Sequence, residues 1–241
     1  MNINKLLQEA NQLILSKKNQ EAEIRYKEII KLDTKNFIAY GNLGYLFLLK
    51  KSYKDSLTLL DGALKIKPDF TDALNNKGIC LKALDRFEEA LECYEKALKI
   101  KPDFTNALNN QGNCFQNLNR FEEALECYKK ALSIKPNYID ALNNLGNCLK
   151  VLNRFEEAIE SYKKALKIKP DFKDVLNNKG VCLKKLDRFE EALECYEKAL
   201  KIKPDFFEAL NNKGTCLTEL YRYDEALSCF KKVLEIKPDF A

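Results

Sequence analysis

The chain of 241 residues contains no histidine, and none of its nine cysteines forms a C-x-x-C pair with another. A zinc site is built from such ligands at short spacings, so the sequence predicts no metal. The eight glycines never form G-x-G-x-x-G or a phosphate-binding loop, and no serine or cysteine stands in a nucleophile motif. These absences favour a protein that is not an enzyme and uses no cofactor.

Long apolar runs are also missing. No stretch approaches the roughly 18 consecutive apolar residues that a membrane span requires, and residues 1–12 lack the basic-then-apolar order of a secretory signal. The 41 basic and 36 acidic residues alternate along the chain rather than forming a basic stripe. We therefore expect a soluble cytoplasmic protein that contacts neither membrane nor nucleic acid.

What the chain does contain is a period of 34 residues. A glycine recurs at this spacing: Gly44, Gly78, Gly112, Gly146, Gly180 and Gly214. All six prolines keep the same period: Pro68, Pro102, Pro136, Pro170, Pro204 and Pro238. A fixed period of this length indicates a repeat array, in which each unit buries its apolar face against its neighbours.

Each unit is expected to be a helical hairpin. In residues 71–104, apolar residues recur at spacings of three, four and seven, as in amphipathic helices. Asp85 and Glu88 between the two apolar sets are typical of a capping box that starts the second helix. Pro102 disfavours helix at the residue before it, which predicts an end near Ile100. Gly78 would let the second helix approach closely, with Ala90 and Ala97 as the matching surface.

The cysteines follow the same period, which argues against disulfides. Five of them come two residues after the repeat glycine, and four lie thirteen residues further on, where Ser161 takes the place of a fifth. We expect them to be reduced thiols that fill packed helix interfaces as small apolar residues.

These motifs resemble the tetratricopeptide repeat (TPR) family. Apart from Leu74, Leu81 and Lys77, which replace the tryptophan, aromatic and leucine of the signature, the unit 71–104 carries the expected glycine, alanines, tyrosine and proline. The leucine ahead of the glycine is kept at Leu43 and Leu145. The resemblance implies an all-α fold, a right-handed α-solenoid of stacked helix-turn-helix hairpins. It also implies a single array over residues 1–241. Its units would be a degenerate 3–36, followed by 37–70, 71–104, 105–138, 139–172, 173–206 and 207–240.

An asparagine stands two residues ahead of each repeat glycine, in mid-helix: Asn42, Asn76, Asn110, Asn144, Asn178 and Asn212. Asparagine is a poor helix-interior residue, because its side chain competes for backbone hydrogen bonds. The series, called the asparagine ladder below, resembles that of O-linked N-acetylglucosamine transferase TPR arrays, where the amides hold an extended peptide backbone. The alternatives are that these amides bridge neighbouring helices, or that recent duplication copied them.

The resemblance places further side chains in the same concave groove. They are the asparagines Asn113 and Asn147 and the lysines Lys82, Lys150, Lys184 and Lys185. The predicted function is a non-catalytic scaffold that binds a protein or extended peptide. One alternative is the substrate-recognition arm of a larger enzyme, a glycosyltransferase or kinase. Another is an array that self-associates end to end through its last repeat, since no extra polar helix follows it.

Overall fold

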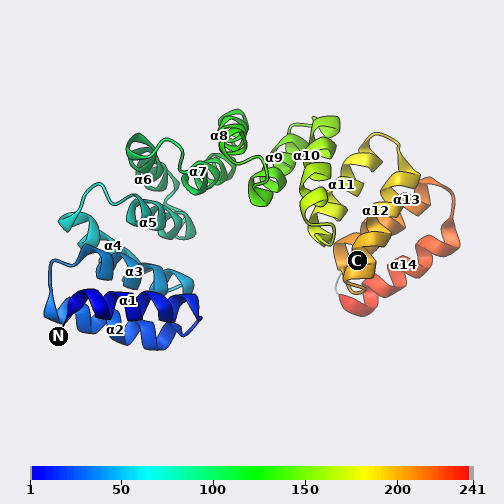
Figure 1. Ribbon diagram of the computed structural model, residues 1–241. Helices are drawn as coiled ribbons and strands as arrows, with labels where there is room; N and C mark the ends of the chain where they lie inside the picture. Colours follow the sequence, from blue (N-terminus) through cyan, green and yellow to red (C-terminus); the bar gives the residue numbers. More distant parts are fainter. Residues whose placement is uncertain (1, 239–241) are drawn as a thin grey trace. The chain divides into compact units, whose positions relative to one another are not determined.

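A computed structural model describes residues 2–238 of the chain and shows an all-α protein in this range. Its helices are α1 (Ile3–Leu15), α2 (Asn19–Leu32), α3 (Phe37–Leu49), α4 (Tyr53–Ile66), α5 (Thr71–Ala83), α6 (Phe87–Ile100), α7 (Thr105–Asn117), α8 (Phe121–Ile134), α9 (Ile139–Val151), α10 (Phe155–Ile168), α11 (Lys173–Lys185), α12 (Phe189–Ile202), α13 (Phe207–Glu219) and α14 (Tyr223–Ile236) (Figure 1). None of these helices combines the length and hydrophobicity of a membrane span.

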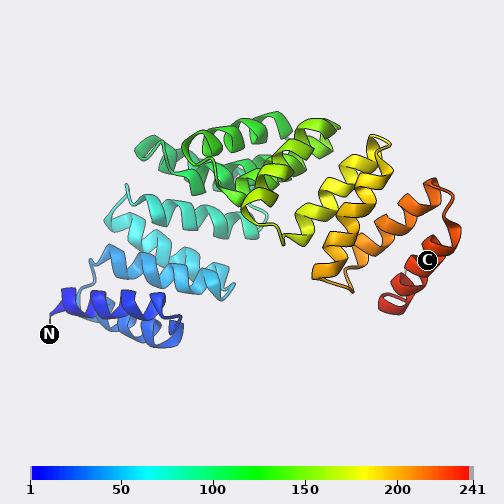
Figure 2. The ribbon, with the colours of Figure 1, turned by 45° about the vertical axis from the view of Figure 1, so that its right-hand side comes forward.

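The helices pack as consecutive hairpins. The chain forms two compact units, residues 2–120 and residues 121–238. Within the first unit α1 packs on α2, α3 on α4 and α5 on α6, and each second helix also packs on the next first helix. The same order holds for α8 to α14 in the second unit, as Figure 2 shows. The predicted fold class, an all-α solenoid of stacked hairpins, is confirmed. The predicted extent of a single array stays a prediction.

The second helices from α4 to α14 end two residues before a proline, as the sequence predicts. Helix α6 ends at Ile100, and Lys101 before Pro102 is extended, with φ −131° and ψ 87°. The last helical residues of α4, α10 and α12 lie at the same distance from their prolines. The restriction that proline imposes on its predecessor favours this end. Helix α2 ends at the equivalent residue, Leu32, with Thr34 in the place of proline, so the proline reinforces an end that the hairpin also adopts without it.

The predicted capping box is wrong. Asp85 has φ 57°, in the left-handed region, and α6 begins only at Phe87 without a side-chain cap. The amide of Asp85 donates to Lys82 at 3.1 Å and that of Arg86 donates to Leu81 at 2.9 Å. This pattern is the Schellman motif, which closes the carbonyl end of the preceding helix. Asp and Asn tolerate the left-handed conformation better than most residues, so the side chain was selected for a helix end rather than a helix start.

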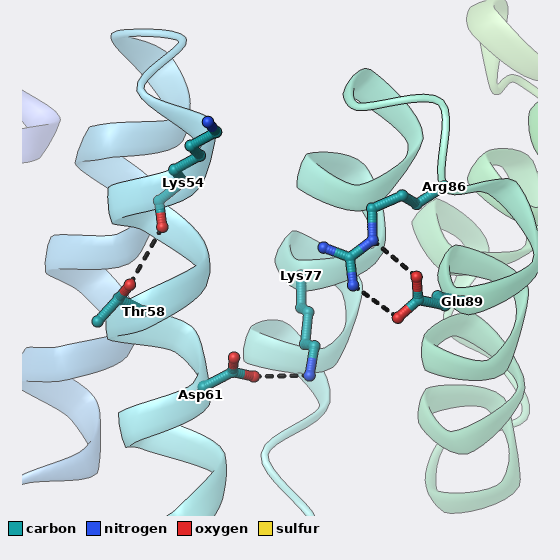
Figure 3. Close-up of polar contacts among 6 residues, drawn as sticks. All are labelled: Lys54, Thr58, Asp61, Lys77, Arg86 and Glu89. Carbon is teal, nitrogen blue, oxygen red and sulfur yellow. Dashed lines mark hydrogen bonds and ion pairs between the residues drawn. The ribbon is translucent and has the colours of Figure 1, made fainter.

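A glutamate in the first turn of α6 forms an ion pair on the surface. The carboxylate of Glu89 accepts two hydrogen bonds from the Arg86 guanidinium, both at 2.7 Å, and the close-up in Figure 3 shows the two side chains face to face. The pairs Arg154–Glu157, Arg188–Glu191 and Arg222–Glu225 repeat this geometry. Both partners of each pair are exposed to solvent, so these pairs add little to the stability of the hairpins.

The repeat glycine allows the close approach that was predicted, and the partner is an aromatic ring. A Cβ added at Gly78 would lie 2.5 Å from the Tyr94 ring, and one at Gly180 equally close to Tyr196. Ala90 and Ala97 are fully buried, but the ring makes the tight contact. Any side chain at the glycine would therefore displace a buried tyrosine.

All nine cysteines are free and buried, as the sequence predicts. Burial raises the pKa of the thiols of Cys127 and Cys182 to about 11, which keeps them protonated at neutral pH. A protonated thiol is a poor nucleophile and a poor metal ligand. Among residues 2–238, no cluster of acidic residues and cysteines suits a metal ion.

Candidate functional site

The predicted site residues lie on the first helix of each hairpin. The asparagine ladder is distributed one residue to a helix over α3, α5, α7, α9, α11 and α13, and all six side chains are half-buried. Asn113, Asn147, Lys82, Lys150 and Lys184 are half-buried too, whereas Lys185 is exposed. We call the surface that these first helices present within each unit the first-helix face.

Two members of the ladder donate to the preceding first helix with the same sequence spacing between donor and acceptor, which we call their register. The Asn110 amide donates to the Asn75 side-chain oxygen at 3.0 Å, and Asn212 donates to Asn177 at 3.0 Å. Each acceptor lies 35 residues earlier and is itself buried. The asparagine just before a ladder residue, Asn75 or Asn177, is therefore a buried acceptor, and the ladder residue of the next hairpin is its donor.

Two other members use a second register. The Asn178 amide donates to Asn147 at 3.0 Å, and Asn42 donates to Asn11 at 3.1 Å, in each case to a residue 31 positions earlier. The same acceptors take a hydrogen bond from a tyrosine of the second helix. The Tyr162 hydroxyl donates to Asn147 at 2.8 Å and that of Tyr26 donates to Asn11 at 2.6 Å.

The residue after the repeat glycine decides between these registers. Where it is asparagine, as at Asn147, it accepts from both the tyrosine and the ladder. Where it is aliphatic, as at Ile79 and Val181, the ladder residue of the next hairpin donates instead to the asparagine four positions before the aliphatic residue, Asn75 or Asn177. The hydroxyls of Tyr94 and Tyr196 are then buried without a hydrogen-bond partner among the described residues.

A connected polar cluster forms in the second unit from three of the predicted residues. The Lys150 ammonium donates to the Asn178 oxygen at 2.9 Å, while the Asn178 amide donates to Asn147. Burial lowers the pKa of Lys150, because the charged form loses hydration there. We call Asn147, Lys150 and Asn178 the polar cluster. An ammonium offers three donors and an amide two donors and an acceptor with two lone pairs, so each member retains capacity for a further bond.

The remaining predicted residues are not gathered into this cluster. Asn144 lies on the same helix as Asn147, and its oxygen accepts a long 3.5 Å contact from the Asn143 amide. Asn76 accepts a similar contact from Asn75. Lys82, Lys184 and Lys185 stand on the last turns of α5 and α11. The amides thus bridge neighbouring helices, one of the alternatives the sequence left open, and peptide gripping stays a prediction.

Sequence reasoning missed the partners of the ladder. Asn75, Asn177 and the paired tyrosines accept or donate the bridging bonds, but neither hydrophobic periodicity nor the signature points to them. The signal that could have found the tyrosine bond is the joint occurrence, within one repeat, of asparagine after the glycine and tyrosine sixteen residues after the glycine, as in 139–172. Interhelical hydrogen bonds between such side chains make up only a small share of protein hydrogen bonds.

Comparison with known proteins agrees with this geometry. A crystal structure of MamA is 25% identical, has a TM-score of 0.64, and covers 67% of this chain and 94% of that chain. YrrB, described as a TPR protein with an unusual peptide-binding site, is 24% identical with a TM-score of 0.64, covering 78% and 97%. PilF of Pseudomonas aeruginosa is 22% identical with a TM-score of 0.75, covering 84% and 92%. No sequence among curated proteins matches the chain.

The family itself is shown by the repeats. The family model described as tetratricopeptide repeat matches residues 71–104, 105–138, 139–172, 174–206 and 207–240. The hairpins α1/α2 and α3/α4, which precede these matches, have the same order of first and second helix. Matches over more than half of the chain, together with stacked hairpins of one pattern, show that this chain belongs to the tetratricopeptide repeat family.

Proposed function

We propose that the protein is a non-catalytic scaffold that binds an extended peptide segment on the first-helix face, without nucleic acid or membrane as partner, in the cytoplasm. TPR repeats serve as protein-interaction scaffolds, and YrrB is described as having a peptide-binding site. The observation that carries the proposal is the polar cluster. Asn147, Lys150 and Asn178 hold one another in place on α9 and α11 and keep unused hydrogen-bonding groups.

A peptide in extended conformation presents a carbonyl and an N–H at every residue. The asparagine amides match both groups, and Lys150 matches a carbonyl or a carboxylate. Because the bridging bonds fix the rotamers of Asn147 and Asn178, little side-chain entropy would be lost when a peptide binds. Each net hydrogen bond contributes about 0.5–1.5 kcal/mol, so affinity would accumulate from several such contacts.

The test uses peptides of about ten residues, selected from a random displayed library and titrated by fluorescence polarisation. The Lys150→Met variant keeps the length of the side chain and removes the charge and the donors. We expect it to weaken the selected peptides at least tenfold, since hydrogen bonds to charged groups contribute about 1.5–3 kcal/mol. Lys198→Met, on the exposed surface of α12, is the matched control and should leave the affinity unchanged.

Equal affinities for wild type and Lys150→Met would contradict the proposal, provided that both variants unfold at the same urea concentration. Selection of no peptide at all from the library would contradict it as well. A loss seen equally in Lys198→Met would assign the effect to overall charge rather than to the polar cluster.

A second candidate is end-to-end self-association, favoured by the exposed apolar face of α14. Leu227 is 53% exposed, whereas its counterpart Leu193 in the preceding hairpin is 6% exposed because the next hairpin covers it. Tyr223 and Leu234 extend the same exposed surface. A face of this composition suits the first helix of another hairpin, including one from a second copy of the chain.

A further inference from the structure

A first helix packs between two successive second helices at the junctions α4–α5–α6, α8–α9–α10 and α12–α13–α14. Beside α9 and α13 the second helices flank a groove that has the first helix at its base. At two of these junctions a lysine closes the groove. Lys77 of α5 reaches Asp61 of α4 at 2.6 Å, as Figure 3 shows, and Lys213 of α13 reaches Glu197 of α12 at 2.8 Å. Only small cavities of about 330 and 220 Å³ are left beside the second pair.

The junction of α8, α9 and α10 lacks this ion pair. Leu145 occupies the place of the lysine, and Lys129 occupies the place of the acidic residue. Opposite them stands Ser161, whose hydroxyl donates to the Leu142 carbonyl at 2.8 Å and so is turned inward. These residues line a groove of about 920 Å³, larger than the grooves beside Glu197 and Lys213.

Leucine in this place does not by itself leave a groove. Leu43 is the counterpart of Leu145 in α3, and it is buried with 3% exposure. There Leu59 stands where α10 has Ser161, and it packs against the apolar cluster that contains Leu43. The groove beside Leu145 therefore differs from the α3 junction in having Ser161 in the place of Leu59. It differs from the two ion-paired junctions, which have Cys93 and Cys229 in the place of Ser161, in having a leucine in place of the lysine.

The base of the groove is apolar and its edges are charged. Leu142, Leu145 and Leu149 of α9 form the base, and Leu132 of α8 adds to it. Among the acidic residues at the edge, Glu157 is paired with Arg154 and Glu160 with Lys163.

The unpaired charge at the edge is positive. Lys129, Lys164 and Lys167 line the groove, and none of them forms an ion pair within residues 2–238. Besides the paired Glu157 and Glu160, the lining contains one more acidic residue, Glu156, against the three lysines. An apolar base under an excess of ammonium groups is complementary to an apolar side chain with carboxylates beside it.

We propose that this groove docks a partner-protein segment that inserts one leucine-like side chain between flanking acidic residues. The leucine packs on the half-buried Leu145, whose neighbours Leu142 and Leu149 are already buried, and the carboxylates meet Lys129, Lys164 and Lys167. The site shares α9 with the first-helix face but uses other residues of that helix, is walled by α8 and α10, and suits a different ligand chemistry, so it is a second interaction surface. A buried aliphatic anchor with a charged rim is a common arrangement at protein interfaces.

The probe is a fluorescein-labelled peptide with one leucine flanked on both sides by glutamates. We expect saturable binding with a Kd below about 1 mM. A second peptide with serine in place of leucine should bind at least about tenfold more weakly, because the aliphatic side chain carries the apolar burial. A third peptide with lysines in place of glutamates should not bind.

Two protein variants close the groove in ways the chain itself uses. Lys129→Glu combined with Leu145→Lys rebuilds the ion pair seen between Glu197 and Lys213, and Ser161→Leu fills the groove as Leu59 does at its own junction. Each should reduce binding of the leucine peptide at least tenfold. The Lys150→Met variant of the first-helix face should bind it as wild type does.

No saturable binding, equal binding of the leucine and serine peptides, or undiminished binding to both closed variants would overturn the proposal. Thermal unfolding followed by circular dichroism establishes that each variant is folded. If Ser161→Leu does not fold, the rebuilt ion pair alone decides the outcome. Loss of binding in Lys150→Met would place the peptide on the first-helix face instead, which also contradicts the proposal and leaves the proposed function standing.

Discussion

At the residue scale, the tyrosines of α10 and α12 that pack over the repeat glycine occupy two different environments. Tyr162 packs over Gly146 and donates to Asn147, whereas Tyr196 packs over Gly180 with its hydroxyl buried and without a partner. Burial raises the pKa of both hydroxyls, since the phenolate loses hydration. The two tyrosines are matched in packing and differ in one hydrogen bond.

This contrast predicts opposite outcomes for one substitution. Tyr162→Phe removes a buried hydrogen bond and should lower the free energy of unfolding by about 1 kcal/mol. Tyr196→Phe removes a desolvated hydroxyl that has no partner, and should leave the free energy of unfolding unchanged or raise it by up to about 1 kcal/mol. Urea unfolding followed by circular dichroism measures both. An equal loss in the two variants would show that the hydroxyl of Tyr196 has a partner in solution.

At the scale of the element, the turn between first and second helix depends on one residue in the left-handed conformation. Asp187 has φ 56° and Asn153 has φ 57°, and both are exposed. Lys17, Lys51 and Tyr221 adopt the same conformation in other hairpins. The Schellman bonds around it are backbone bonds, so the turn does not require one particular side chain, although its cost differs between residues.

Substitutions of the left-handed residue should change the free energy of unfolding according to how readily each residue adopts that conformation. Asp187→Ala is expected to lower the free energy of unfolding by about 1 kcal/mol, because a Cβ-bearing residue without a local hydrogen-bonding side chain pays roughly 1–2 kcal/mol in the left-handed region. Asp187→Asn, the residue at Asn153, should be neutral, and Asp187→Gly should be neutral or stabilising. Chemical unfolding of the three variants tests this order. An alanine variant as stable as the asparagine variant would refute it.

The same turn shows how far sequence reasoning reaches for the elements. The 34-residue period and the prolines correctly placed the hairpins and the ends of the second helices, because proline acts through local sterics. Asp85 and Glu88 were misassigned because aspartate is favoured both at a helix start and in the left-handed residue after a helix end. Only the length of the turn, set by packing of the two helices, distinguishes these cases.

For the candidate site, the period placed the asparagine ladder on the first-helix face but did not predict the bonds it makes. Whether Asn178 or Asn212 turns to one acceptor or another depends on a residue of the preceding hairpin, Asn147 or Val181. Such pairing depends on the packing distance between helices, which a single sequence does not encode locally. The groove beside Leu145 was missed for a related reason. The residues that distinguish it, Lys129, Leu145 and Ser161, are spaced 16 positions apart in the chain.

At the scale of the whole molecule, the exposed face of α14 predicts association. Sedimentation velocity over a range of concentrations should show the mass rising above that of the 27.9 kDa monomer. Leu227→Lys should abolish this increase, because it places a charge in the centre of the apolar face. Ser228→Lys, an exposed neighbour on the same helix, serves as the control and should associate like wild type. A monomer mass independent of concentration would contradict self-association.

A tyrosine stacks on the repeat glycines Gly78, Gly146 and Gly180, and this packing has a spectroscopic consequence. The chain contains no tryptophan, so its intrinsic fluorescence comes from tyrosine alone. Tyr94, Tyr162 and Tyr196 each lie in a separate hairpin, and their rings share the same packing over a glycine. Replacing ten of the eleven tyrosines with phenylalanine, and keeping only Tyr94, Tyr162 or Tyr196, would make the remaining ring an emission reporter of its own hairpin. These three hairpins thus carry built-in optical probes through which ligand binding and unfolding can be followed locally without a foreign dye.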